Sequence, residues 1–183
     1  MKRCYSALVT AVIMIAQVLS FSAPTFAADT AADAQEIVRR SAMTMDKFME
    51  DKNLPLFKKE LEKAKGVLII PQLLRAGYFW GGSGGTGVFM VRNEKSHEWS
   101  EPAFYFVGSV TFGLQIGAEN AEVVMLAMSR KAVDSLLASS FKLGGDISVA
   151  AGPQGAGLEK IVTADFISFA KAKGLYAGLS FEG

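Results

Sequence analysis

Short apolar runs alternate with clusters of glycine in the middle of the chain, between Lys65 and Gly117. Runs of β-branched and aromatic residues are typical of strands, whereas glycine is typical of tight turns, bulges and sharp bends. Val67–Ile70 is short and continuously apolar, which favours a strand that is buried on both faces. We therefore expect a sheet in which the cluster Gly81–Gly87 separates this strand from the next one, Val88–Val91.

The same alternation predicts further strands along the rest of the chain. They are Ala103–Val107, Thr111–Ile116, Glu122–Met128, Ile147–Ala151, Ile161–Phe169 and Leu175–Phe181. Trp99–Pro102 predicts a turn before the first of them, and Lys171–Gly174 predicts a hairpin-like turn before the last. Roughly eight to ten short strands separated by glycine favour an α+β domain. Its sheet is expected to be strongly curved and mostly antiparallel, like a half-barrel or a sandwich.

Three helices are expected beside this sheet, two of them before it and a short one inside the strand series. The first begins near Ala34, and Asp33 is its expected N-cap. The second begins at Pro55, because proline is well tolerated in a first helical turn, and it ends at Gly66. Ser129 is the expected N-cap of the short helix. The side chains that this short helix turns inward are Val133, Leu136 and Leu137.

One side of the first helix carries large apolar side chains at helical spacing. They are Ile37, Met45, Phe48 and Met49. An amphipathic helix of this kind usually packs its apolar stripe against a sheet. The alternative is a segment that can also lie on a membrane surface, which would make these four residues membrane-facing.

The first 27 residues have the layout of a secretory signal peptide. Lys2 and Arg3 form a positive start, Ala7–Leu19 is an apolar stretch, and Thr25-Phe26-Ala27 supplies small residues for cleavage after Ala27. An uncleaved anchor is the alternative, but the apolar stretch is shorter than the roughly 20 residues that span a membrane. We therefore expect a signal peptide at 1–27, a flexible leader at 28–33 and a single domain at 34–183.

The distribution of cysteine and charge excludes several kinds of site and partner. Cys4 is the only cysteine and lies before the cleavage point, so the mature domain has no disulfide, thiolate metal site or cysteine nucleophile. An oxidising compartment such as a bacterial periplasm, or its outer membrane, suits such a chain. Loss of Lys2 and Arg3 reduces the 19 basic residues by two, against 18 acidic ones, which makes the mature chain nearly neutral. A nearly neutral chain is a poor candidate for nucleic-acid binding.

Residues for catalysis are scarce in this chain. Gly82–Gly87 spells GxGxxG, but a predicted strand follows it where a dinucleotide site needs a helix. His97 is the only histidine and lies in a polar turn, so neither a paired-histidine zinc site nor a Ser-His-Asp triad is indicated. The carboxylates expected to be most withdrawn from water are Glu119, Asp165 and Glu182. We expect no cofactor and no metal, and an enzyme is the third hypothesis behind two binding functions.

Several short segments, in order and in spacing, resemble the SYLF family of lipid-binding domains, also described as the Ysc-type actin-binding domain. The segments are Ala64-Lys65-Gly66-Val67, the Gly81–Gly87 cluster, Trp99-Ser100-Glu101-Pro102, Gln115-Ile116-Gly117-Ala118-Glu119, Ala150-Ala151-Gly152-Pro153 and the ending from Lys173 to Gly183. Together they cover the chain from about Ala34 onward. Members of the family usually continue beyond the final Glu182-Gly183, so the resemblance implies either a fragment or a domain that lacks the family's final strand or helix.

The resemblance implies a non-enzymatic module that binds anionic lipid, phosphoinositides in eukaryotic members, through basic residues and an amphipathic N-terminal helix. Some eukaryotic members also bind actin, and bacterial members with signal peptides are exported. The candidate lipid-binding residues here are Lys58, Lys59, Lys63, Lys65, Arg75, Lys171 and Lys173. We expect phosphatidylglycerol, cardiolipin or lipopolysaccharide as the anionic partner in a bacterial envelope. The alternative is a structural or protein-interaction module of the envelope that presents a sheet edge or an apolar patch.

Overall fold

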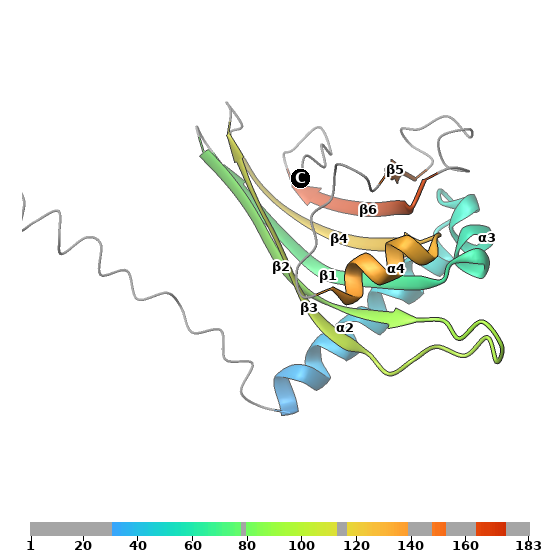
Figure 1. Ribbon diagram of the computed structural model, residues 1–183. Helices are drawn as coiled ribbons and strands as arrows, with labels where there is room; N and C mark the ends of the chain where they lie inside the picture. Colours follow the sequence, from blue (N-terminus) through green and yellow to red (C-terminus); the bar gives the residue numbers. More distant parts are fainter. Residues whose placement is uncertain (1–30, 78–79, 113–116, 139–147, 153–163, 175–183) are drawn as a thin grey trace, which may run out of the picture. The chain divides into compact units, whose positions relative to one another are not determined.

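The computed structural model describes residues 31–77, 80–112, 117–138, 148–152 and 164–174, which form a curved, unclosed sheet with helices beside it (Figure 1). Three helices lie in these ranges: α2 (Ala31–Glu50), α3 (Pro55–Lys63) and α4 (Arg130–Leu137). Six strands lie there too: β1 (Gly66–Gly77), β2 (Trp80–Val91), β3 (Ala103–Phe112), β4 (Gly117–Ala127), β5 (Val149–Ala151) and β6 (Phe166–Gly174). The predicted α+β class is confirmed.

Strand β1 is central in a sheet whose strand order is β3-β2-β1-β4-β6-β5. Every neighbouring pair is antiparallel except β5 and β6, which are parallel. The prediction of a mostly antiparallel sheet is therefore confirmed. Strands β2 and β3 are longer than we expected, because the glycines that suggested breaks, Gly81–Gly87 and Gly108, lie inside them.

The cluster Gly81–Gly87 is part of strand β2 and not a turn between strands, so that prediction was wrong. Its glycines allow the backbones of β1 and β2 to approach closely. A Cβ built at Gly87 would lie 2.2 Å from the carbonyl oxygen of Ile69, and one at Gly85 would lie 2.4 Å from that of Gln72. Both contacts are with backbone atoms, which cannot rotate away as a side chain can.

A β-bulge in β1 lies opposite this glycine stretch. The register shifts between Ile69 and Leu74 against β2, and between Ile70 and Leu73 against β4, so β1 carries an extra residue relative to both neighbours. Pro71 lies in the bulge, where the missing proline N–H removes no regular ladder bond. The side chain of Gln72 accepts a 2.8 Å hydrogen bond from Arg40 of α2, which ties the helix to the bulge.

Hydrophobic side chains are buried on both faces of the sheet. Val67 and Ile69 of β1 pack with α2 and α3 on one face, and Leu68 and Ile70 pack with α4 on the other. Alternate side chains of a strand point to opposite faces, so a continuous apolar run is required where both faces are covered. The prediction that Val67–Ile70 is buried on both faces is confirmed.

The short helix α4 begins as predicted, because the Ser129 hydroxyl accepts a hydrogen bond from the backbone N–H of Ala132. Val133 and Leu136 are buried as expected. Leu137 is exposed, so its predicted inward orientation was wrong. A helix turns by about 100° per residue, so the side chain that follows Leu136 leaves the buried face.

Three predicted element ends differ from the structure. Helix α2 begins at Ala31, so Asp33 lies in its first turn instead of capping it. Gly66 begins β1, where a Cβ would lie 2.9 Å from the ring of Phe89, and so it is not the end of α3. Lys171–Gly174 extends β6 and pairs with Glu119–Glu122 of β4, so the predicted turn was wrong. The predicted strand Leu175–Phe181 lies outside the described residues. Within the described ranges, no helix has both the length and the hydrophobicity to cross a membrane.

Replacing Gly87 by alanine is expected to destabilise the protein, because the new methyl group would overlap the Ile69 carbonyl. We expect a loss of about 2 kcal/mol or more in the free energy of unfolding, measured by denaturant titration. Gly82→Ala is the matched control, since its nearest neighbour, the Ser109 carbonyl oxygen, is 3.5 Å away. That variant should change stability by less than about 1 kcal/mol. Equal effects of the two substitutions would contradict the close-approach explanation.

Candidate functional site

Two of the four lysines in α3 and just after it form ion pairs. Lys58 and Lys59 of α3 are exposed, and neither has an acidic partner among the described residues. Lys63 forms a 2.9 Å ion pair with Glu60 on the same helix, and Lys65 forms one of 2.9 Å with Glu94. Opposite charges within a few ångströms largely cancel at longer range, so Lys58 and Lys59 dominate the local positive field.

The other candidate cations lie elsewhere on the sheet. Lys171 of β6 forms a 2.7 Å ion pair with Asp51 and lies 4.8 Å above the ring of Phe48, which fixes it beside the α2–α3 connection. Arg75 of β1 is half-buried and lies two residues beyond Leu73, on the face that α4 covers. Lys173 belongs to β6 by its backbone pairing, and its side chain lies outside the described part of the structure. The structure therefore places Lys171 beside the α2–α3 connection and Arg75 on the opposite face of the sheet.

The apolar stripe of α2 faces the sheet. Phe48 is fully buried, and its ring lies 5.6 Å from that of Phe57 of α3. Ile37, Met45 and Met49 are partly buried and pack against the same cluster. The sheet-packing interpretation of this helix is confirmed, so in this conformation Phe48 is a core residue and not an exposed membrane contact.

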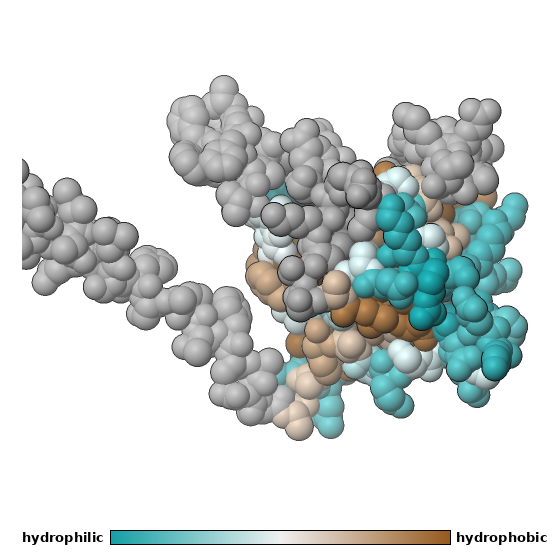
Figure 2. Space-filling model, viewed as in Figure 1, coloured by the Kyte–Doolittle hydropathy of each residue, from teal (hydrophilic) through white to brown (hydrophobic). Residues whose placement is uncertain are grey.

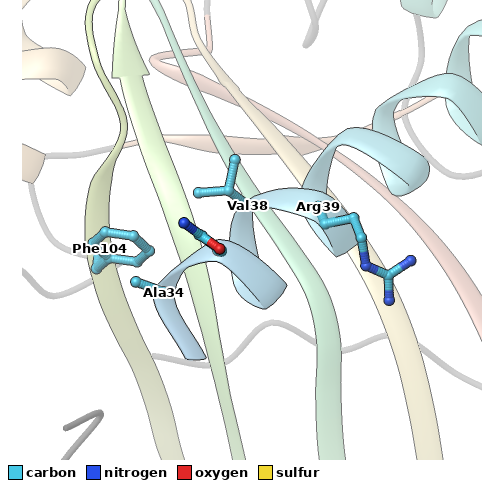
Figure 3. Close-up of a pocket in the computed structure, with 5 residues that line it drawn as sticks. Ala34, Val38, Arg39 and Phe104 are labelled. Carbon is cyan, nitrogen blue, oxygen red and sulfur yellow. The ribbon is translucent and has the colours of Figure 1, made fainter. Parts of the chain in front are cut away.

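Exposed apolar side chains gather instead along edge strand β3 and the neighbouring part of α2. Phe104 and Phe106 are 49 % and 71 % exposed, and Val38 of α2 is also exposed. A groove of about 340 Å³ separates the helix from the strand, lined by Ala34, Gln35, Val38, Arg39 and Phe104. Figure 3 shows Ala34 pointing toward the Phe104 ring, while Arg39 points away. On the face seen in Figure 2, hydrophilic residues gather toward α3 and the loop after β2.

Sequence reasoning did not single out this groove, although one signal was available. The segment Ala103–Phe112 reads AFYFVGSVTF and contains no charged residue and no proline. Its aromatic residues occupy both faces, since Tyr105 packs toward α4 while Phe104 and Phe106 face the α2 side. A half-exposed strand usually alternates polar and apolar residues, so aromatic residues at alternate and intervening positions were a signal that both faces of this strand are apolar.

The remaining candidate groups hold structural positions. His97 is exposed in the loop after β2 and has a positive φ of 61°, as a tight polar turn requires. The GxGxxG segment continues as strand through Val91, without the helix N-terminus that would hold a pyrophosphate. No cluster of three or more potential metal ligands occurs within the described ranges.

Of the three carboxylates expected to be withdrawn from water, Glu119 is buried, Asp165 is half-buried and Glu182 lies outside the described residues. Glu119 of β4 is 5 % exposed, and its Oε2 atom has no hydrogen-bond partner in the described part of the chain. Asp165 accepts hydrogen bonds from the Ser129 hydroxyl at 2.6 Å and from the backbone N–H and hydroxyl of Ser148, each at 3.1 Å. These bonds lower the pKa of Asp165 below its ordinary value, and the bond from Ser129 has the largest effect. Asp165 thus joins the starts of α4, β5 and β6.

Comparison with known proteins identifies the family. Residues 108–183 match the Ysc84 model, described as "Las17-binding protein actin regulator". Protein YSC84 of Saccharomyces cerevisiae is 32 % identical over 82 % of this chain and 33 % of its own length. SH3 domain-containing YSC84-like protein 1 of Homo sapiens is 30 % identical over 82 % of this chain and 44 % of its own length. The chain belongs to the Ysc84 (SYLF) family.

The resemblance seen in the sequence segments is therefore confirmed. Another relative, LAS seventeen-binding protein 3 of Saccharomyces cerevisiae, is 35 % identical over 67 % of this chain and 28 % of its own length. This SYLF chain spans less than half the length of these three relatives. No solved structure gives a significant match to the chain.

Protonation of Asp165 is expected to weaken this SYLF fold at low pH. Its pKa is lowered in the folded state, so its contribution is present above the unfolded-state pKa and is lost as pH falls through the folded-state pKa. Asp165→Asn removes the charge and is expected to cost roughly 1–3 kcal/mol at pH 7. The difference between the free energies of unfolding of the two proteins, measured from pH 7 downward, should stay constant to about pH 4 and narrow below it. A difference that stays constant with pH would contradict an ionised Asp165.

Proposed function

We propose that this chain is a non-enzymatic binding module that associates with anionic phospholipid surfaces after export to the cell envelope. The observation that carries the proposal is the pair Lys58 and Lys59, which are adjacent, exposed and without a described acidic partner. Lys171 lies near the same end of the domain, although Asp51 offsets its charge. The N-terminal layout supports export, and phosphatidylglycerol or cardiolipin would be the available anionic lipids.

The expected strength of this association follows from charge. Each basic side chain near an anionic surface contributes about 1 kcal/mol, and the contribution falls off within a Debye length. Two free lysines therefore support a weak, reversible and salt-sensitive attachment. The family membership agrees with a binding role, and the scarcity of reactive groups in the sequence argues against a catalytic one.

A second candidate is a protein-binding module, favoured by a different observation. The matching family model is described as a Las17-binding protein actin regulator, and one relative is named LAS seventeen-binding protein 3. In the structure, strand β3 offers an edge with exposed Phe104 and Phe106 beside the α2 groove. Such an edge can accept a partner strand.

Neutralising the two free lysines is expected to weaken binding to anionic vesicles. Lys58→Gln combined with Lys59→Gln should raise the dissociation constant roughly thirtyfold, from about 1 kcal/mol per charge. The measurement is co-sedimentation with phosphatidylglycerol-containing vesicles at low salt, compared with phosphatidylcholine vesicles.

A matched control removes the same charge from the other face of the sheet. Arg130 and Lys131 begin α4, whose buried residues pack on the face opposite α3, and both are exposed. Replacing both by glutamine should change vesicle binding by less than about threefold, because the charges are removed from the far side of the sheet. Equal recovery of the unmodified protein from both vesicle types would refute lipid binding. An equal loss in the control would show that net charge, not the α3 surface, governs it.

A further inference from the structure

Strand β3 forms one edge of the sheet, and its outer side is open among the described residues. It pairs with β2 along its length, from Phe112 opposite Trp80 to Ala103 opposite Phe89. No backbone hydrogen bond outside that ladder involves β3 in the described part of the chain. Each outward N–H and C=O group of an edge strand can pair with another strand.

The usual protections of a free edge are missing from β3. Edge strands in soluble proteins are commonly short or carry a lysine, a proline or a bulge. The opposite edge, β5, has three residues, whereas β3 has ten. The ten residues Ala103–Phe112 include neither a charged side chain nor a proline, and the register with β2 runs without interruption. An edge of this kind is typical of a strand that another strand covers.

Two apolar features lie two residues apart on this edge: the exposed ring of Phe106 and the groove lined by Phe104. Phe106 is 71 % exposed and projects from the α2 side of the sheet. Phe104, on the same side, lines the groove with Ala34 and Val38 of α2 (Figure 3). A projecting ring and an apolar groove that lie two positions apart on one strand can fit a second copy of the same strand.

We propose that β3 pairs antiparallel with β3 of a second copy of this chain, around a twofold axis that passes at Tyr105. In this register each Phe106 lies directly opposite the other copy's Phe104. Side chains at opposite positions point to the same face, so each Phe106 ring lies beside the groove of the other copy. The same patch serves both copies, as a twofold interface requires.

The absence of charge on β3 favours a second copy over a charged partner strand. Like charges directly opposite each other destabilise a strand pair. Because β3 carries no charge, self-pairing places none opposite another, and a charged partner strand would find no complementary side chain along it. Tyr105 donates its hydroxyl hydrogen bond to the carbonyl of Leu136 on the α4 side, so pairing at the edge leaves that contact unchanged.

The size of the contact indicates a weak dimer. A phenylalanine side chain covers roughly 200 Å², so exposures of 49 % and 71 % leave about 240 Å² of ring surface on each copy. A specific interface needs roughly 1,200 Å² in total, and the four rings of a pair supply about two fifths of it. The paired strands and the α2 flanks supply the remainder. We expect a dissociation constant on the order of micromolar.

The test is the oligomeric state of the protein purified from cells that express the full chain, whether or not the cells cleave its N-terminal segment. It is measured without lipid or detergent. Light scattering after size exclusion and sedimentation equilibrium should show a dimer that dissociates on dilution. Phe106→Lys should raise the dimer dissociation constant at least tenfold, because each dimer loses two ring contacts. Leu74→Lys is the matched control: Leu74 is 55 % exposed on the same face, but it lies in the central strand β1. That variant should remain dimeric.

Disulfide formation checks the register. Residues directly opposite in an antiparallel pair have Cα atoms about 4.5–5.5 Å apart, which a disulfide can bridge. In a Cys4→Ser background, a mixture of Phe104→Cys and Phe106→Cys chains should form a crosslinked dimer, and either chain alone should not. A monomeric protein at about 100 μM would overturn the proposal. Dissociation of the dimer by Leu74→Lys to the same extent as by Phe106→Lys would also overturn it. So would a Phe106→Lys variant that loses vesicle binding but keeps its oligomeric state, because that result would assign the aromatic edge to a bilayer.

Discussion

Burial of β1 on both faces is the constraint on which the rest of the fold depends. The run Val67–Ile70 sends alternate side chains to opposite clusters, so helices must cover both faces of the sheet at this point. Helices α2 and α3 cover one face and α4 covers the other. At its far end β1 remains beyond these helices, and there Leu74 is exposed. The described core is therefore concentrated around one half of the central strand.

The bulge and the glycines adapt β1 to its neighbours. Pro71 would interrupt a regular central strand, and the bulge at Ile70–Leu73 gives it a place without a ladder bond. Gly85 and Gly87 lie opposite, where β2 approaches the displaced backbone too closely for a Cβ. The bulge and the glycines are thus two parts of one local arrangement.

Sequence patterns predicted the elements that depend on residues close by in the chain. They failed for the elements whose conformation is determined by pairing with another strand. Val67–Ile70, the Ser129 cap and the buried stripe of α2 follow from periodicity and capping, and they were predicted. The role of Gly87 depends on its distance to Ile69, which is a tertiary property. For the same reason Lys171–Gly174 looked like a turn, although pairing with β4 holds it in a strand.

The ion pairs around the candidate site also differ in whether the sequence could predict them. The pair Lys63–Glu60 is three residues apart on a helix and can be anticipated, whereas Lys65–Glu94 and Lys171–Asp51 join distant segments. Clustering in the sequence therefore overstated the free positive charge, which the fold reduces around α3 chiefly to Lys58 and Lys59.

The aromatic edge was underestimated from the sequence. AFYFVGSVTF predicts an ordinary strand, and only the strand order shows that this strand is an edge. The described helices cover the two faces of the sheet around β1 and β4. Among the described residues, the outer side of β3 has no partner strand. Two-sided burial of β1 thus accounts for the core, whereas the edge position of β3 follows from its terminal place in the described strand order.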